Sequence, residues 1–97
     1  MIGRKAALAA ILLLAPLTVR AAEAPTGATA CSGCHAASAN VDTPVPPLAG
    51  RHSLELYGAL LAFKTGQRQG TIMDRIAKGF TDEELKAIAE WYGAQKE

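Results

Sequence analysis

Cys31-Ser32-Gly33-Cys34-His35 is the most informative segment of this 97-residue chain. Two thiols stand three residues apart, and a histidine directly follows the second one. One turn of helix lets both thiols reach the two vinyl groups of one porphyrin, while the imidazole turns toward the iron. The spacing is the pattern of covalent haem attachment. We therefore predict one haem, bonded to Cys31 and Cys34, with His35 as an axial iron ligand.

Other uses of a cysteine pair explain the segment less well. A zinc site needs four ligands, and the chain offers this pair, His35 and His52, with no second Cys-x-x-Cys. A thioredoxin-like redox pair belongs to a βαβ unit, and no run of β-branched or aromatic residues predicts such a sheet. A structural disulfide between Cys31 and Cys34 would close a very small loop and leave His35 without a role.

Residues 1–21 have the features of a secretory signal peptide. A basic start, residues 1–5, precedes the apolar residues 6–14. Ala21 and the residue two before it suit a signal peptidase, which favours cleavage after Ala21 and a mature chain of residues 22–97. The alternative is an uncleaved anchor, but about a dozen apolar residues fall short of the ~20 that span a bilayer. We expect an exported chain without a membrane span after cleavage.

Cleavage would also change the charge of the chain. The full sequence has 10 Lys and Arg against 9 Asp and Glu, a formal net charge of +1. Loss of Arg4, Lys5 and Arg20 leaves seven basic and nine acidic residues, a balance of −2. Basic residues dominate the middle of the mature chain and acidic residues its end, which predicts solvated helix faces and indicates no nucleic-acid partner.

The mature length predicts a single small domain. About 76 residues is near the size at which a polypeptide core alone is only marginally stable. A porphyrin supplies a large apolar surface around which short helices pack. We therefore predict an all-α, mono-haem domain over residues 22–97, with three to four short helices around the haem.

Local signals place the first two helices. A short helix from Ala28 ends at the haem motif, and the prolines of residues 38–47 predict a loop. Ser53 is expected to cap a helix over residues 54–65, which Gly66 ends.

The last helix carries the clearest signals. Thr81 and Glu84 have the spacing of a capping box, and acidic residues suit the positive end of the helix dipole. Apolar residues follow at i, i+3, i+4 and i+7, and the helix is expected to end near Gly93. They are Leu85, Ile88, Ala89 and Tyr92.

An electron carrier needs a sixth iron ligand, for which the chain offers two candidates. Met73 is the only methionine after Met1 and lies in a segment expected to be a loop between the last two helices. Its thioether would stabilise Fe(II) and raise the reduction potential. His52 is the alternative, although a histidine beside Arg51 at a helix start is more often a surface residue.

The mature chain resembles the class I c-type cytochromes over nearly its whole length. Pro46-Pro47-Leu48-Ala49-Gly50 is similar to the Pro-x-Leu-x-Gly segment of that family. The resemblance implies that the carbonyl of Pro46 accepts a hydrogen bond from Nδ1 of His35, that Leu48 packs on the haem, and that Met73 is the sixth ligand. It also implies that haem is attached in the periplasm.

A narrower resemblance is to the cytochrome subunit of flavocytochrome c sulfide dehydrogenase. It rests on residues 63–66 and on Thr71-Ile72-Met73-Asp74-Arg75-Ile76-Ala77-Lys78-Gly79-Phe80. The resemblance implies that the haem subunit docks on a flavoprotein that oxidises sulfide, accepts electrons from its FAD and passes them to a downstream acceptor. Some members have two haem domains, but this chain has one attachment motif, so electrons would be transferred singly.

The chain itself has no flavin-binding motif, since its nine glycines do not form Gly-x-Gly-x-x-Gly. Sulfide chemistry would therefore belong to the partner, and we expect no catalysis by this chain. Three functions stay open. They are an electron-transfer subunit of a sulfide-oxidising flavoprotein, a free-standing electron shuttle with another donor, and a catalytic or gas-binding haem with an open iron position.

Overall fold

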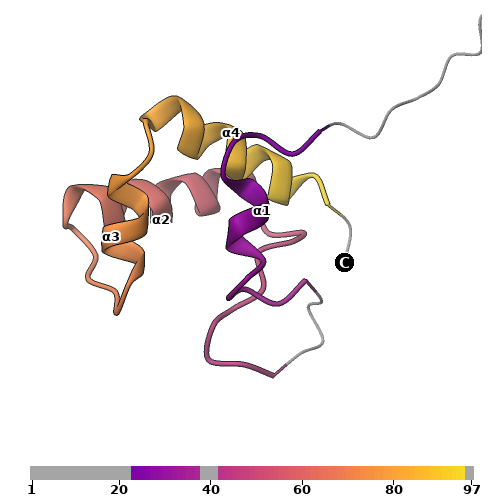
Figure 1. Ribbon diagram of the computed structural model, residues 1–97, viewed down its shortest axis with the longest axis horizontal. Coiled ribbons are helices and arrows are strands. Elements are labelled where there is room, and N and C mark those ends of the chain that lie inside the picture. The colour runs from indigo at the N-terminus through magenta and orange to yellow at the C-terminus, as the bar shows by residue number, and fades with distance from the viewer. Residues whose placement is uncertain (1–22, 38–41, 96–97) are drawn as a thin grey trace, which may run out of the picture.

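The computed structural model describes residues 23–37 and 42–95, and all of its regular elements are helices. They are α1 (Ala28–Cys31), α2 (Ser53–Thr65), α3 (Met73–Lys78) and α4 (Asp82–Gly93) (Figure 1). The predicted all-α fold is confirmed. The predicted signal peptide and part of the 38–47 loop lie outside the described residues. Among the described helices, none has the length and apolar character needed to cross a bilayer.

Helix α2 begins one residue earlier than predicted. Ser53 is its first helical residue, and His52 is the N-cap, whose Nδ1 accepts a hydrogen bond from the backbone N–H of Leu54 at 3.2 Å. The prediction that Ser53 caps this helix was wrong, because the imidazole nitrogen takes the free N–H group that a serine hydroxyl was expected to satisfy. Gly66 ends the helix as predicted, at φ 83°, a conformation that favours glycine.

Helix α3 occupies a segment for which the sequence predicted a loop. Met73 is its first residue, so the prediction that Met73 lies in a loop was wrong. Asp74 in the first turn and Lys78 in the last turn complement the helix dipole, which favours the helix. The helix has only six residues, which are too few to show the hydrophobic periodicity by which a helix is predicted from sequence. The helix packs against α2.

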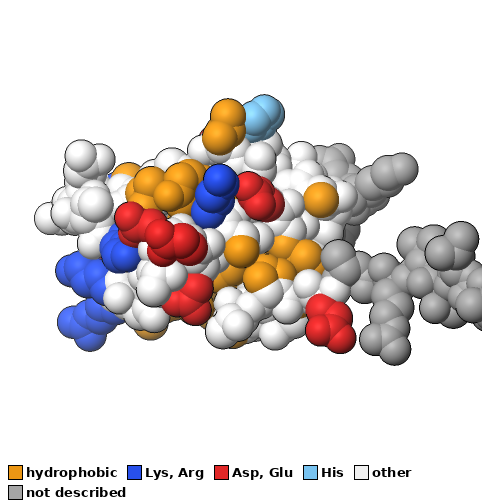
Figure 2. Space-filling model, turned by 90° about the horizontal axis from the view of Figure 1, so that it is seen from above, with side chains coloured by type: hydrophobic (Ala, Val, Ile, Leu, Met, Phe, Trp, Pro, Cys, Tyr) orange, Lys and Arg blue, Asp and Glu red, His pale blue; other side chains and the backbone are white. Residues whose placement is uncertain are grey.

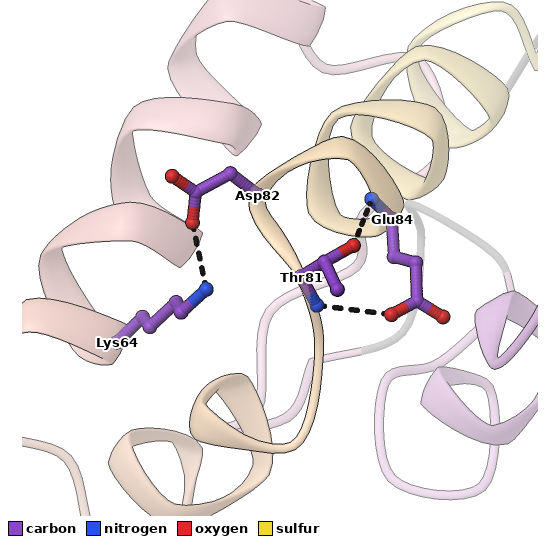
Figure 3. A network of polar contacts seen from close by, with 4 residues as sticks. All are labelled: Lys64, Thr81, Asp82 and Glu84. Carbon is purple, nitrogen blue, oxygen red and sulfur yellow. Dashed lines mark hydrogen bonds and ion pairs between the residues drawn. The ribbon is translucent and has the colours of Figure 1, made fainter.

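Helix α4 forms as predicted. The side chain of Thr81 accepts a hydrogen bond from the N–H of Glu84 at 3.1 Å, and the Glu84 carboxylate accepts one from the N–H of Thr81 at 2.9 Å (Figure 3). An ion pair of 2.7 Å between Lys64 Nζ and Asp82 Oδ1 joins the end of α2 to the start of α4 (Figure 3). The helix ends at Gly93, and α4 also packs against α2.

The buried core joins α1 and α2 to the apolar face of α4. The main cluster consists of Ala28, Leu56, Ile88, Ala89 and Tyr92. At the entry to α1, Gly27 has φ 83° and lies directly under the ring of Phe80, where an added Cβ would stand 2.3 Å from the nearest ring carbon. Only glycine allows this close approach, and the approach fixes α1 against the turn between α3 and α4.

Candidate haem-binding site

A cavity of about 810 Å³ lies among the four helices and the residues 44–48. This volume falls within the range of roughly 300–1,000 Å³ that is typical of cofactor pockets. Most of the wall is apolar, which suits a porphyrin ring. The apolar side chains that line it include Leu56, Leu60, Phe63, Ile72, Ile76 and Phe80.

His35 lies in the cavity wall with its ring orientation set by the backbone. Its Nδ1 is 2.6 Å from the carbonyl oxygen of Pro46. Because a carbonyl oxygen only accepts hydrogen bonds, Nδ1 carries the proton, and Nε2 keeps a free lone pair. Pro46 and Leu48 also line the cavity. The contact that the resemblance implied between His35 and Pro46 is therefore present, and it leaves Nε2 available to a metal.

Both cysteines of the attachment motif line the same cavity. Cys31 ends α1, and the N–H groups of Cys34 and His35 donate to its carbonyl at 3.2 and 2.9 Å, which continues the chain in a tight turn. The thiols are free, with Cys31 half-buried and Cys34 exposed. Burial raises the pKa of the Cys31 thiol. The turn thus brings two thiols and an imidazole to one wall.

Tyr92 connects this wall to α4. Its buried hydroxyl donates to the carbonyl oxygen of Ala28 at 2.5 Å and lies 3.0 Å from Oγ of Ser32. Its backbone carbonyl accepts a hydrogen bond from Gly50 at 3.1 Å. From the sequence, Tyr92 was predicted only to lie on an apolar helix face. A tyrosine on a buried helix face needs a hydrogen-bond partner for its hydroxyl. That requirement could have indicated that Tyr92 bonds to a neighbouring segment.

Met73 lies in the cavity wall that α3 contributes, and its side chain is half-buried. The structure thus brings Met73 and His35 to one cavity. His52 is not among the lining residues, is exposed, and uses its Nδ1 to cap α2. Within residues 23–37 and 42–95, no three His, Cys, Asp or Glu side chains gather as a metal site, so the ligands of the zinc alternative do not meet.

Charged residues that the sequence analysis did not single out also line the cavity. Arg51 and Glu55 form an ion pair one helical turn apart. The guanidinium of Arg68 lies 4.7 Å from the centre of the Phe63 ring. On the face shown in Figure 2, acidic and basic side chains lie next to each other beside an orange patch of hydrophobic ones. Nothing in the sequence distinguishes these arginines from others on the surface.

A family profile described as Cytochrome c matches residues 21–92, which include the attachment motif, the proline segment and Met73. The chain belongs to the cytochrome c family. As a class I c-type cytochrome it is expected to bind haem c covalently, and the residues of the cavity fit that group. Two free thiols at the required spacing, an imidazole with a free Nε2 and an apolar wall suit a porphyrin joined through sulfur.

The cytochrome is similar to proteins named for electron transfer. It is 41% identical over 63 residues to the cytochrome subunit of sulfide dehydrogenase from Chlorobaculum tepidum, covering 65% of this chain and 57% of that protein. It is 36% identical over 73 residues to the thiosulfate dehydrogenase electron acceptor of Stutzerimonas stutzeri, covering 69% of this chain but 34% of that protein. These relatives and the family support electron transfer as the function.

A third relative is matched over most of that relative's length. Cytochrome c-554(548) of Halomonas halodenitrificans is 31% identical over 70 residues, which cover 68% of this chain and 84% of that protein. The chain thus spans a little over half of the sulfide dehydrogenase subunit and most of this smaller cytochrome.

Proposed function

We propose that the cytochrome is the haem subunit of a sulfide-oxidising flavoprotein. It would accept electrons one at a time from the flavin and pass them to a downstream acceptor. The observation that carries the redox role is the placement of His35 and Met73 in the wall of one apolar cavity, beside both cysteines. The similarity to the sulfide dehydrogenase cytochrome subunit supports the choice of partner.

The residues of the cavity have distinct roles in this proposal. Cys31 and Cys34 would hold the haem through two thioether bonds, and His35 and Met73 would supply the ligands of its iron. When bound, the haem supplies a one-electron centre that alternates between Fe(III) and Fe(II). The Pro46 carbonyl orients the imidazole and makes it a stronger donor, since it accepts the Nδ1 proton at 2.6 Å. Leu48 lines the cavity and would help to keep water away from the bound group.

This ligand set favours electron transfer over catalysis or gas binding. With both His35 and Met73 bound, the iron would have no free coordination position, whereas catalysis requires an open or labile one. His52 was the distal base that the sequence offered, and it is not in the cavity wall. We therefore expect the reduced protein to bind carbon monoxide slowly and incompletely at neutral pH. Rapid and complete binding would instead favour the catalytic or gas-binding function.

A single haem determines how the partner's electrons are collected. A flavin reduced by sulfide holds two electrons, and one haem accepts only one of them. The cytochrome would therefore be reoxidised by its acceptor between the two transfers. FAD belongs to the flavoprotein, because this chain has no Gly-x-Gly-x-x-Gly motif to bind the dinucleotide.

Reconstitution with the flavoprotein tests the choice of partner. The purified cytochrome is mixed with the sulfide dehydrogenase flavoprotein of its native source, and haem reduction is followed after sulfide is added. We expect rapid reduction that depends on the flavoprotein, and co-elution of the two proteins on gel filtration. A sample without flavoprotein is the control. Equal reduction in both samples would contradict the proposal.

A free-standing electron shuttle is the second candidate. It is favoured by the match to cytochrome c-554(548), because that match covers 84% of the relative's own length. Purification of the cytochrome from the native extract without a bound flavoprotein would support the shuttle. For either role, we propose that the protein acts in the periplasm after removal of residues 1–21. The intact mass of the exported polypeptide tests that cleavage.

A further inference from the structure

Helix α2 carries apolar residues on two opposite faces. One face lines the haem cavity and includes Leu56 and Leu60. On the opposite side, four residues follow one another at spacings of four, three and four, which places them on one line along the helix. They lie outside the set that lines the cavity. The outer face of α2 consists of Leu54, Gly58, Leu61 and Thr65.

The outer face is open to solvent. Leu54 is 72% exposed, the largest value among the exposed large hydrophobic residues of the described chain. Gly58 and Thr65 are also exposed, and Leu61 is half-buried. Helices α3 and α4 pack against α2 but leave this face uncovered. A helix that is apolar on all sides is normally buried on all sides, so the outer face lacks the cover that its composition predicts.

Gly58 gives an independent indication of a missing neighbour. It lies near the middle of α2, and no atom of the described residues is within 4 Å of the Cβ that it lacks. Its φ is not in the left-handed region. Glycine inside a helix is less favourable than alanine, and nothing within this chain requires it here. The absent side chain allows a second helix to approach the backbone closely at this point.

The charges around the outer face balance in pairs. Arg51 pairs with Glu55 near the start of α2, and Lys64 pairs with Asp82 near its end. An identical surface would therefore meet no net charge that repels it. A twofold axis beside Gly58 would set two copies of α2 antiparallel, with the acidic first turn of one at the same end as the basic last turn of the other. Opposed helix dipoles also favour this contact.

We propose that the outer face of α2 binds a second copy of this chain, which gives a twofold-symmetric dimer. Leu54 and Leu61 would pack on either side of the close approach at Gly58. The cavity lies on the opposite face of α2, so the contact leaves the cavity wall uncovered. The inference goes beyond the proposed function and does not depend on the electron donor. A dimer of holoprotein would carry two one-electron centres in one particle.

Sedimentation velocity of the purified, exported protein over a range of concentrations tests the dimer. The wild type is expected to shift from monomer to dimer as its concentration rises. Leu54→Glu should raise the dimer dissociation constant at least about tenfold, because symmetry introduces the buried charge twice. The fold should tolerate this change, since the side chain is exposed and a carboxylate suits the first turn of a helix. Thr29→Glu is the matched control, since it adds the same charge to an exposed residue of α1 and should leave the constant unchanged.

Gly58→Gln separates the dimer from the stability of the helix. Glutamine is a better helix former than glycine, so the monomer should unfold at the same or a higher denaturant concentration. Its side chain would hold the second helix away, so the dimer should weaken. A wild type that stays monomeric at every concentration, or a dimer that survives both substitutions, would overturn the proposal. A monomer that binds the flavoprotein and loses it in the Leu54→Glu protein would assign the face to that partner and also overturn the dimer.

Discussion

The two sides of the cavity that carry His35 and Met73 are held in different ways. On the His35 side, the imidazole bonds to the Pro46 carbonyl, and Tyr92 ties the attachment segment to α4. On the Met73 side, the N-cap of the short helix α3 is Ile72, a residue that makes no side-chain capping hydrogen bond and is 57% exposed. Directional bonds orient the first side, and packing against α2 supports the second.

This difference predicts which axial ligand is lost first. Segments with few buried contacts and exposed ends open at a lower free energy than the core does. Mild denaturant or rising temperature should therefore detach the Met73 thioether from the iron before the His35 side unfolds. The cytochrome is expected to pass through a state that keeps its haem and α4 but has an altered iron spectrum.

Loss of the Met73 thioether should have the largest effect on the redox properties. Met73→Ala deletes the thioether, so the midpoint potential should fall strongly, and reduced protein should bind carbon monoxide completely. His52→Ala is the matched control, because it removes the other candidate ligand and should leave both measurements unchanged. Redox titration and carbon monoxide difference spectra check this. A His52→Ala protein that loses its ligand while Met73→Ala keeps it would reverse the assignment.

The His35 side of the cavity can be destabilised by a substitution at Gly27. Gly27→Ala forces a Cβ to within 2.3 Å of the Phe80 ring and places a side chain at φ 83°. We expect a loss of about 2–4 kcal/mol of unfolding free energy, from left-handed strain and overpacking together. Gly66→Ala is the control, since it has the same φ but no atom within 4 Å of an added Cβ, and should cost about 1–2 kcal/mol. Chemical denaturation measures both, and equal losses would mean that the Phe80 contact contributes nothing.

The hydrogen bond of Tyr92 can be removed without its ring. Tyr92→Phe leaves the buried carbonyl of Ala28 without its donor, so we expect a loss of about 1–3 kcal/mol at neutral pH. Denaturation followed by far-ultraviolet circular dichroism measures it. An unchanged stability would mean that the tie between α1 and α4 rests on packing alone.

Tyr92 also predicts the behaviour of the protein in alkali. Burial raises the pKa of its phenol above the ordinary value of 10.0. The folded chain therefore keeps the phenolic proton at a pH where the unfolded chain has lost it, so stability is full below the ordinary pKa and declines as pH rises toward the raised value. Wild-type unfolding free energy should fall more steeply above that pH than that of Tyr92→Phe. Parallel curves would show that other groups dominate.

The smallest effect is expected far from the iron, at the start of α4. Thr81→Ala removes the cap that accepts the N–H of Glu84, which should cost about 1 kcal/mol. The visible spectrum and the midpoint potential should not change. Thermal unfolding provides the measurement. A shifted potential would show that the start of α4 is coupled to the redox site.

The sequence was most informative where one residue type has a single local purpose. The attachment motif, the Thr81 capping box and the Gly66 helix end each depend on neighbours within a few residues, and the helix signals among them were confirmed. Helix α3 was not predicted because six residues are too few to show a helical hydrophobic periodicity. His52 was missed as a cap because imidazole is an uncommon choice where serine stands next to it.

Contacts between residues far apart in the chain could not be predicted from the sequence, for a different reason. The hydroxyl of Tyr92 meets Ala28 across 64 positions, and no local pattern encodes that meeting. Arg68 and Arg51 look alike in the sequence, yet one is paired with Glu55 and the other lies over Phe63. The contact of His35 with Pro46 was expected only through resemblance to a family, and the structure contains it.

The central claim is that Cys31 and Cys34 hold one haem between His35 and Met73. Its most direct test is the intact mass of the purified, exported protein after extraction with acidified organic solvent, which removes haem that is not covalently bound. The proposed structure predicts a red polypeptide whose mass exceeds that of its chain by one haem, with the addition confined to the peptide that contains both cysteines. A colourless protein with the mass of the bare chain would contradict it.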